Sequence, residues 1–134
     1  MSQFSLPIRV YIEDTDAGGI VFYANYLRYM ERARTEWLRA CGIELDELLY
    51  EQRVQFVVRS VQIDFHKPAR FNDELSACAN LMTLKSASLI CEQPIMRGET
   101  LLTQAHVRLA SVNVDTLAPC AIPRNLKEAM TREF

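Results

Sequence analysis

The sequence predicts an α+β fold in which a five-stranded antiparallel sheet packs around one long helix. A helical period of apolar residues covers about 23–41 and does not recur until the last dozen residues. One β-branched run precedes this helix and four follow it, and the order strand, helix, four strands is typical of α+β domains. The length of 134 residues predicts a single domain, 1–134, by the prior of roughly 100–200 residues per domain.

The first expected strand covers residues 6–13, where Ile8, Val10 and Ile12 alternate onto one face. It runs into the segment Asp14-Thr15-Asp16-Ala17-Gly18-Gly19. Two carboxylates, a hydroxyl and paired glycines predict a tight turn there.

The expected helix 23–41 is amphipathic and about five turns long. Gly42 directly follows its last periodic residue and predicts a left-handed cap. One side of the helix carries Tyr26, Met30, Ala33, Trp37 and Cys41, and the other carries Arg28, Glu31, Arg32, Thr35 and Arg39.

Four further strands are expected at 54–65, 74–84, 87–95 and 101–114, with turns at 67–73 and 85–86. Within 101–114 the alternation changes phase at Ala110, which indicates a bulge or a strand covered on both faces. A helical turn over 46–52, an extended tail over 116–123 and a terminal helix over 124–131 complete the chain. Since one helix covers only one face of such a sheet, we expect a homo-oligomer, a dimer that extends the sheet.

Charge and composition exclude several classes of function. Fifteen Lys and Arg against seventeen Asp and Glu give a formal charge of −2, which argues against nucleic acid as a partner and leaves any anionic ligand to a local basic patch. No apolar stretch approaches the roughly 18 residues of a membrane span, and residues 1–7 do not resemble a signal peptide. We therefore expect a cytoplasmic protein.

The cysteines and histidines do not predict a metal site. Cys41, Cys78, Cys91 and Cys120 are scattered, and with His66 and His106 they form no zinc-ligand spacing. We expect reduced thiols, two ordinary strand histidines, no metal and no cofactor.

The segment 11–26 is the candidate for chemistry, because it leads from a strand end through a glycine loop to a helix start. A helix start offers unpaired N–H groups and partial positive charge, which polarise a carbonyl oxygen. A nearby carboxylate can then act as general base or nucleophile. The commoner alternative is that Asp14, Thr15 and Asp16 only cap the turn. A calcium loop fits poorly, because Gly18 and Asn25 stand where acidic ligands are needed.

This segment resembles a known signature. Asp14-Thr15-Asp16-Ala17-Gly18-Gly19-Ile20-Val21-Phe22-Tyr23-Ala24-Asn25-Tyr26, followed by Glu31-Arg32-Ala33-Arg34, is similar to the hotdog-fold acyl-CoA thioesterases of the 4-hydroxybenzoyl-CoA thioesterase family, above all to their Tol-Pal-associated, YbgC-like group. Phe56-Val57-Val58-Arg59, Pro68-Ala69-Arg70 and the strand 86–93 also fit.

The resemblance implies a hotdog fold and the hydrolysis of an acyl-coenzyme A to a free acid and coenzyme A. It implies that Asp16 is the catalytic carboxylate, and that N–H groups near Tyr23 hold the oxyanion. Gly18 and Gly19 would let the loop approach the ligand, and Asn25 and Tyr26 would fix the start of the helix. Many Tol-Pal-associated relatives carry His where Tyr23 stands, whereas the 4-hydroxybenzoyl-CoA enzyme carries Tyr.

The phosphates of coenzyme A, which is part of the substrate and not a cofactor, need a few basic side chains. Candidates are Arg59, Lys67, Arg70, Lys85 and Arg97, and the family's nucleotide site points to Lys85, Ser86 and Ser88. The resemblance also implies a homotetramer, a dimer of dimers, and partners such as acyl carrier protein or enzymes of phospholipid synthesis.

The alternative is a non-catalytic module that binds acyl-CoA or acyl carrier protein for the cell-envelope machinery. The sequence offers no G-x-S-x-G elbow, Walker loop or G-x-G-x-x-G loop. No His lies between Asp16 and Trp37, where hotdog dehydratases carry one, and this favours thioester hydrolysis over hydration.

Overall fold

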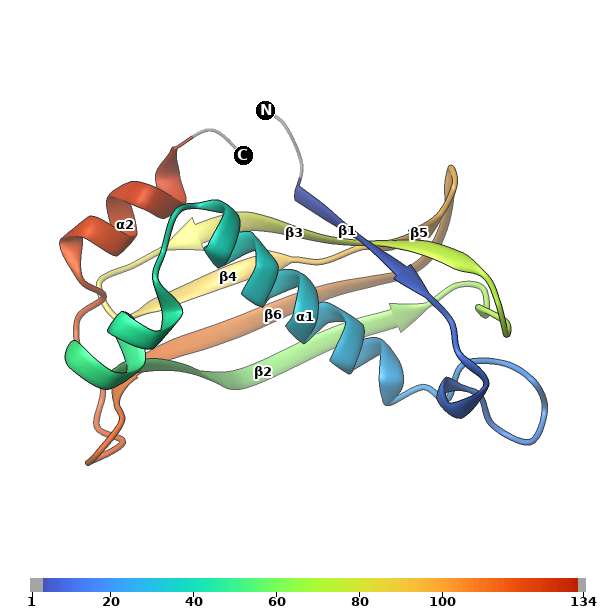
Figure 1. Cartoon of the computed structure of the whole chain (residues 1–134), viewed down its shortest axis with the longest axis horizontal. Coiled ribbons are helices and arrows are strands. Elements are labelled where there is room, and N and C mark those ends of the chain that lie inside the picture. Colours follow the sequence, from blue (N-terminus) through green and yellow to red (C-terminus); the bar gives the residue numbers. More distant parts are fainter. Residues whose placement is uncertain (1–3, 133–134) are drawn as a thin grey trace.

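The structure is a computed structural model that describes residues 4–132. Its sheet has the strand order β1-β3-β4-β6-β2, with β5 pairing β3 and β6, and every pair is antiparallel. The elements are β1 (Phe4–Arg9), α1 (Asn25–Ala40), β2 (Val54–Phe65), β3 (Glu74–Leu84), β4 (Ser88–Glu92), β5 (Ile95–Arg97), β6 (Thr100–Asn113) and α2 (Arg124–Thr131), with short helical turns η1 (Ile12–Asp14) and η2 (Glu47–Glu51). Figure 1 shows α1 lying across one face of the curved sheet, as the predicted hotdog arrangement requires.

Helix α1 packs its apolar side into the core, as the sequence predicts. Its buried residues are Tyr26, Tyr29, Met30, Ala33 and Trp37. The helix begins at Asn25 and ends at Ala40, so it is shorter than expected, and Cys41 is its cap. Gly42 has φ +86°, and the Ile43 N–H reaches back to the Leu38 carbonyl at 3.2 Å, which confirms the left-handed cap.

Strand β1 ends earlier than predicted. Residues 12–14 form η1, and Ile12, expected on the inner face, is 69% exposed. The Asp14 carboxylate accepts the Tyr11 N–H at 2.9 Å, and the Asp14 N–H donates to the Tyr11 carbonyl at 3.0 Å. These bonds turn the chain away from the sheet just after Arg9, which pairs with the first residue of β3.

The sheet has six strands and not five, because the run predicted at 87–95 is divided. Gln93 and Pro94 separate β4 from β5. Both pieces lie between β3 and β6. Proline has no N–H to continue the ladder, so the strand breaks there.

The bulge expected in 101–114 lies mainly in the neighbouring strand. The register of β2 against β6 shifts between Val58 and Ser60, so Val58 and Val61 both pair with buried residues of β6, Leu109 and Val107. A second irregularity falls where β5 meets the start of β6. The phase change in β6 reflects coverage of both faces, since the four residues 109–112 are all buried.

The remaining elements follow the prediction in outline. The helical turn expected at 46–52 is the π-helical η2, and the terminal helix is α2. Pro119 of the extended tail bridges to Val112. Within residues 4–132 no helix is long and apolar enough to cross a membrane.

Candidate active site

The glycine loop is a closed hairpin tip with Asp16 at its base. The Asp16 N–H donates to the Ile20 carbonyl at 2.8 Å, and the Gly19 N–H donates to the Asp16 carbonyl at 3.0 Å. Oδ1 of Asp16 accepts the Gly18 N–H at 2.8 Å, while the side chain as a whole is exposed. The carboxylate is thus held by one bond and open to a ligand.

The turn between β2 and β3 holds the loop in place, although the two segments are distant in the sequence. Tyr26, at the helical end of the loop, and Ala69 of the turn are 43 residues apart. Val21 donates its N–H to the Ala69 carbonyl at 2.9 Å, and Tyr26 Oη accepts the Ala69 N–H at 3.0 Å. Burial raises the pKa of Tyr26, so it stays a neutral phenol. Ile20 also bridges to Arg70. The segment Pro68-Ala69-Arg70 therefore supports the loop.

The start of α1 is not capped by a side chain. Its N-cap residue is Ala24, and no side-chain cap bond forms. Among hydrogen bonds between residues 4–132, the N–H groups of Tyr23 and Ala24 have no acceptor. Unpaired N–H groups at a helix start are donors of the kind that can bind a carbonyl oxygen.

Asp14 and Asn25 hold the base of the hairpin. The Asp14 carbonyl accepts the Phe22 N–H at 2.9 Å and Nδ2 of Asn25 at 2.8 Å. The Tyr29 hydroxyl is buried, and no acceptor lies within hydrogen-bond distance among the described residues. Burial raises the pKa of Tyr29, and the nearby Asp14 carboxylate adds to this. Asp14 accordingly shapes the loop.

A shallow groove of about 300 Å³ adjoins the loop and the helix start. Its lining is mainly apolar and consists of Ile20, Val21, Tyr23, Tyr26, Phe65, His66, Lys67 and Pro68. Sequence reasoning treated His66 as an ordinary strand residue, and the structure places it in this groove with Lys67. The one sequence signal for this placement is that His66 and Lys67 directly precede Pro68-Ala69-Arg70.

Of the expected phosphate-binding residues, the structure places Lys67, Arg70 and Arg97 near the loop of the same chain, whereas Arg59, Lys85, Ser86 and Ser88 lie away from it. Strand β3 has 11 residues, about 35 Å at the usual rise, and its Glu74 end lies beside the loop, since the Val10 N–H donates to the Asp73 carbonyl. Lys85, Ser86 and Ser88 follow its other end, next to the tail, where the Ser86 carbonyl accepts the Ile122 N–H. Arg59 lies midway, at the bulge of β2. Figure 1 shows the two ends of the sheet far apart.

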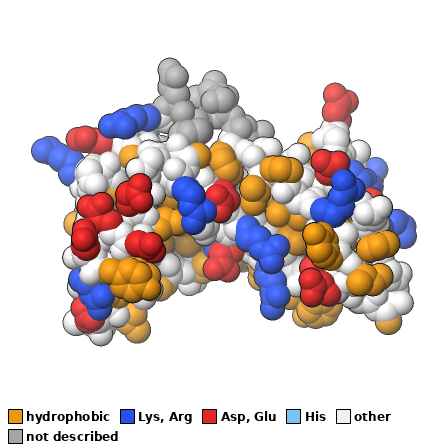
Figure 2. All heavy atoms as spheres, viewed as in Figure 1, with side chains coloured by type: hydrophobic (Ala, Val, Ile, Leu, Met, Phe, Trp, Pro, Cys, Tyr) orange, Lys and Arg blue, Asp and Glu red, His pale blue; other side chains and the backbone are white. Residues whose placement is uncertain are grey.

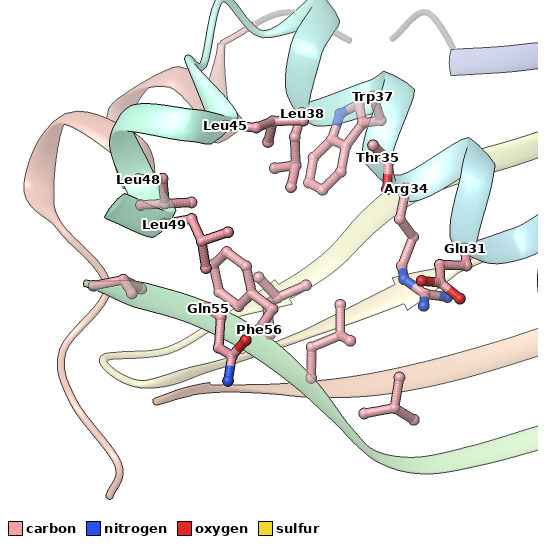
Figure 3. A pocket seen from close by; sticks show the side chains of 14 residues that line it. Glu31, Arg34, Thr35, Trp37, Leu38, Leu45, Leu48, Leu49, Gln55 and Phe56 are labelled. Carbon is pink, nitrogen blue, oxygen red and sulfur yellow. The ribbon is translucent and has the colours of Figure 1, made fainter. Parts of the chain in front are cut away.

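A second cavity of about 300 Å³ lies between α1, η2 and β2 (Figure 3). Trp37, Leu38, Leu48 and Phe56 are among its apolar walls, and Arg34 stands at its polar side. Arg34 donates to Oε1 of Gln93 at 3.0 Å, and burial lowers its pKa.

On the face drawn in Figure 2, several acidic side chains gather at the left end of the molecule, and basic, acidic and apolar side chains are mixed elsewhere. Among the described residues no group of three or more His, Cys, Asp or Glu side chains is arranged to hold a metal ion. All four cysteines are free thiols.

Comparison with known proteins identifies the same family as the hairpin signature. Residues 10–130 match the thioesterase-like superfamily. The chain is 42% identical to the acyl-CoA thioesterase YbgC of Haemophilus influenzae over 126 residues, 94% of this chain and 93% of that one. It is 40% identical to the acyl-CoA thioester hydrolase YbgC of Escherichia coli O6:H1 over 124 residues, 92% of each chain.

Solved structures that are similar to this chain point to the same family as these relatives. A probable thioesterase from Bartonella henselae is 34% identical, with a TM-score of 0.87 over 91% of this chain and 100% of that one. The BH1999 gentisyl-coenzyme A thioesterase is 28% identical, with a TM-score of 0.85 over 94% of this chain and 98% of that one.

Proposed function

Because the chain belongs to the thioesterase-like superfamily and is a thioester hydrolase, we propose that its substrate is an acyl-coenzyme A, cleaved to the free carboxylic acid and coenzyme A. One observation carries the proposal. A single hairpin presents an exposed Asp16 carboxylate and leads directly to two unpaired N–H groups at an uncapped helix start.

In this mechanism the N–H groups of Tyr23 and Ala24 bind the thioester oxygen and stabilise the negative charge that develops on it. Asp16 acts in one of two ways. As a base it takes a proton from water, the water oxygen bonds to the carbonyl carbon, and the C–S bond breaks with the proton passing to the thiolate. As a nucleophile its oxygen bonds to that carbon, the thiolate leaves, and water hydrolyses the resulting anhydride.

The substitution Asp16→Asn tests the role of the carboxylate. Asparagine keeps an oxygen that can accept the Gly18 N–H, so the loop and the melting temperature should be preserved, while acyl-CoA hydrolysis should fall by about 10²–10⁴. Asp14→Asn is the matched control, because the Asp14 side chain accepts the Tyr11 N–H and an amide oxygen can do the same. We expect less than a tenfold loss there.

The outcomes of this test separate the alternatives. Unchanged hydrolysis in Asp16→Asn, or an equal loss in both variants, would remove Asp16 from the mechanism. If the wild type binds acyl-CoA and hydrolyses none of a panel from acetyl to palmitoyl, then the chain is the binding module and not the enzyme.

The active unit of this proposal is a homodimer formed through the edge strand β2. The outer edge of β2 has no partner in the described chain, and Val58 (49%), Val61 (37%) and Phe65 (50%) are exposed along it. An exposed apolar edge is a template for another strand. A second copy pairing antiparallel about the middle of β2 would bring the Val54 end of one copy beside the Phe65 end of the other.

This pairing would explain how Arg59, Lys85, Ser86 and Ser88 serve the site. Ser88 and Val57 both pair with Ala110, so they share a row at the Val54 end of the sheet. In the proposed dimer that row faces the loop of the second copy, and these side chains are offered to the coenzyme A phosphates. A dimer of such dimers, a cytoplasmic location and an acyl carrier protein as partner stay predictions.

A further inference from the structure

One imidazole lies in the groove beside the loop. His66 directly follows β2, and the N–H groups of His66 and Lys67 both donate to the Leu102 carbonyl, at 2.8 and 3.1 Å. The Phe65 ring meets the Tyr26 ring edge to face, with a centroid distance of 5.6 Å. Figure 1 shows the end of β2 near the start of α1. The backbone of His66 is thus held beside the helix start.

The groove joins His66 to the expected oxyanion site. His66 and Tyr23 both line this space of about 300 Å³. The Tyr23 N–H is one of the two donors that have no acceptor among the hydrogen bonds of residues 4–132. Ile20 also lines the groove, and its carbonyl accepts the Asp16 N–H at 2.8 Å. A thioester bound at the Tyr23 N–H would therefore lie in a space that His66 borders.

The two histidines of the chain have different surroundings. Nε2 of His106 lies 3.7 Å from the Glu92 carboxylate. His66 is exposed, and within residues 4–132 it forms no ion pair with a carboxylate. The His66 imidazole is therefore available to a ligand, whereas His106 already has a partner.

The charged and titratable groups around His66 come from five segments. They are Asp64 of β2, Lys67 and Arg70 of the following turn, Asp16 and Tyr23 of the loop, Tyr26 of α1, and Arg97 of β5, which donates to the Pro68 carbonyl at 3.2 Å and pairs with Asp73. From β6, Leu102 and Thr103 lie beside this end of β2 and carry no charge.

The sulfur of a thioester needs a proton when it leaves. As the C–S bond breaks, the electron pair goes to sulfur, and the thiolate takes up a proton to give the free thiol. Ordinary pKa values are about 6.5 for histidine, about 8.5 for a cysteine thiol and about 10 for tyrosine and lysine. An imidazolium is therefore a stronger acid than the thiol, whereas a phenol or an ammonium is weaker. Burial raises the pKa of Tyr26 further, and its Oη already accepts the Ala69 N–H.

We propose that His66 is a catalytic acid, whose imidazolium donates a proton to the thioester sulfur as the C–S bond breaks. This inference rests on the proposed function, in which Asp16 and the Tyr23 N–H act on the carbonyl. When Asp16 is the base, the proton that it takes from water returns to the neutral imidazole through solvent. When Asp16 is the nucleophile, the water that hydrolyses the anhydride returns that proton. In both routes one water is consumed, and the products are the carboxylic acid and the free thiol.

The substitution His66→Gln tests this role, with His106→Gln as the matched control. The substrate is the acyl-CoA that the wild type hydrolyses fastest in the panel above. General acid catalysis typically contributes about 10²–10⁴-fold, and a thiolate can also leave unaided, so His66→Gln should lower kcat by about 10²-fold. His106→Gln should match the wild type. Neither histidine is buried, so both variants should keep the wild-type melting temperature.

The pH dependence reports on the proton itself. Histidine side chains change charge between about pH 5 and 8, and an acid acts only while it is protonated. The kcat of the wild type should therefore fall as the pH rises through this range, and so should that of His106→Gln. In His66→Gln this fall should be absent.

Two further thioesters of the same acyl group separate proton donation from other roles. The S-(4-nitrophenyl) thioester releases a thiolate that is stable without a proton, so His66→Gln should hydrolyse it as fast as the wild type does. The N-acetylcysteamine thioester releases an alkyl thiolate like that of coenzyme A but carries no phosphate. With this substrate His66→Gln should again lose about 10²-fold.

Three results would overturn the role of His66. Full activity of His66→Gln with acyl-CoA is the first. An equal loss with the S-(4-nitrophenyl) thioester is the second, because it indicates a structural role. A loss that disappears with the N-acetylcysteamine thioester is the third, because it indicates that His66 only binds a phosphate. Each leaves the proposed function intact if hydrolysis by the wild type depends on Asp16, whereas a wild type that hydrolyses none of the panel refutes both.

An NMR experiment adds a readout besides activity. The chain has two histidines, so its two imidazole C2–H signals can be assigned with His66→Gln and His106→Gln. The probe is the decyl thioether of coenzyme A, which keeps the sulfur, lacks the carbonyl and cannot be hydrolysed. Its binding should shift the His66 signal and leave the His106 signal in place. Binding measured by calorimetry without a shift of the His66 signal would also overturn the proposal.

Discussion

At the scale of single residues, the two carboxylates of the hairpin have different surroundings although they are two positions apart. Asp14 accepts the Tyr11 N–H and its carbonyl binds Phe22 and Asn25. Asp16 accepts only the Gly18 N–H and is otherwise exposed. The chain thus uses one acid to build the loop and leaves the other available to a ligand.

The conformation of Gly19 is a second requirement of the loop. Its φ is +83°, a region that costs an ordinary L-residue about 1–2 kcal/mol. A Cβ there would meet nothing within 4 Å, so strain and not a clash decides the effect. We expect Gly19→Ala to destabilise the loop by about 1 kcal/mol and to lower hydrolysis by shifting Asp16.

Gly19→Asn is the control for this prediction, since asparagine tolerates the left-handed region. It should keep both the melting temperature and most of the activity. Equal losses in the alanine and asparagine variants would show that the side chain and not the backbone conformation matters.

The predicted site residues that the structure brings together are contiguous in the sequence. Asp16, Gly18, Tyr23 and Asn25 meet because one short hairpin joins them. Ala69 supports that hairpin from the turn after β2, and such a contact between distant segments leaves no periodic signal. Lys85, Ser86 and Ser88 lie at the other end of β3. The resemblance to a family predicted them as ligand-binding residues, but it carries no information on which copy of the chain they serve.

At the scale of elements, one buried side chain fastens α1 to the sheet. Nε2 of Gln93 donates to the Met30 carbonyl of α1 at 2.9 Å and to the Cys78 carbonyl of β3 at 3.2 Å, and its Oε1 accepts from Arg34. Gln93 has no exposed surface. It sits where the strand breaks into β4 and β5, so the break serves to aim this amide at the helix.

Gln93→Leu should therefore destabilise the fold. The substitution removes the amide from the Met30 and Cys78 carbonyls and from the Arg34 guanidinium, at about 1–3 kcal/mol for each buried group left unsatisfied. Urea denaturation should show the loss as a lower midpoint. Gln104→Leu, whose amide accepts only the neighbouring Ala105 N–H, is the control. A Gln93→Leu protein as stable as this control would contradict the role of Gln93.

The elements themselves follow from sequence where one periodicity is maintained, and less well where it changes. The period of α1 predicts its buried face. In β2, the alternation Val54, Phe56, Val58 resumes one residue late at Val61 and Ile63, and the bulge between them returns the apolar side chains to the inner side. That signal is visible in the sequence, whereas the early end of β1 depends on the Asp14 bond to Tyr11, which no period reveals.

At the scale of the whole molecule, the described chain is incomplete as a site for a ligand as long as an acyl-coenzyme A. The loop lies at one end of the sheet, and the turn after β3 with Lys85 and Ser86 lies at the other. The apolar cavity opens between them at an unpaired edge. An antiparallel dimer through β2 joins the two ends of different copies, which is why we expect the dimer and the activity to go together.

Cysteine cross-linking across the predicted two-fold axis tests this assembly. We place the two-fold axis at Ser60, beside the middle of β2, so that the two copies of this residue face each other with Cα atoms about 4.5–5.5 Å apart. Such a separation suits a disulfide, so Ser60→Cys should form a covalent dimer under mild oxidation, visible on a non-reducing gel.

Ser5→Cys is the matched control, because Ser5 is an exposed serine on β1, the opposite edge of the sheet. The wild type measures the background from its four free thiols. Light scattering of the wild type should give at least twice the 15.4 kDa chain mass. A monomer at micromolar concentration, or cross-linking through Ser5→Cys and not Ser60→Cys, would rule out assembly through β2.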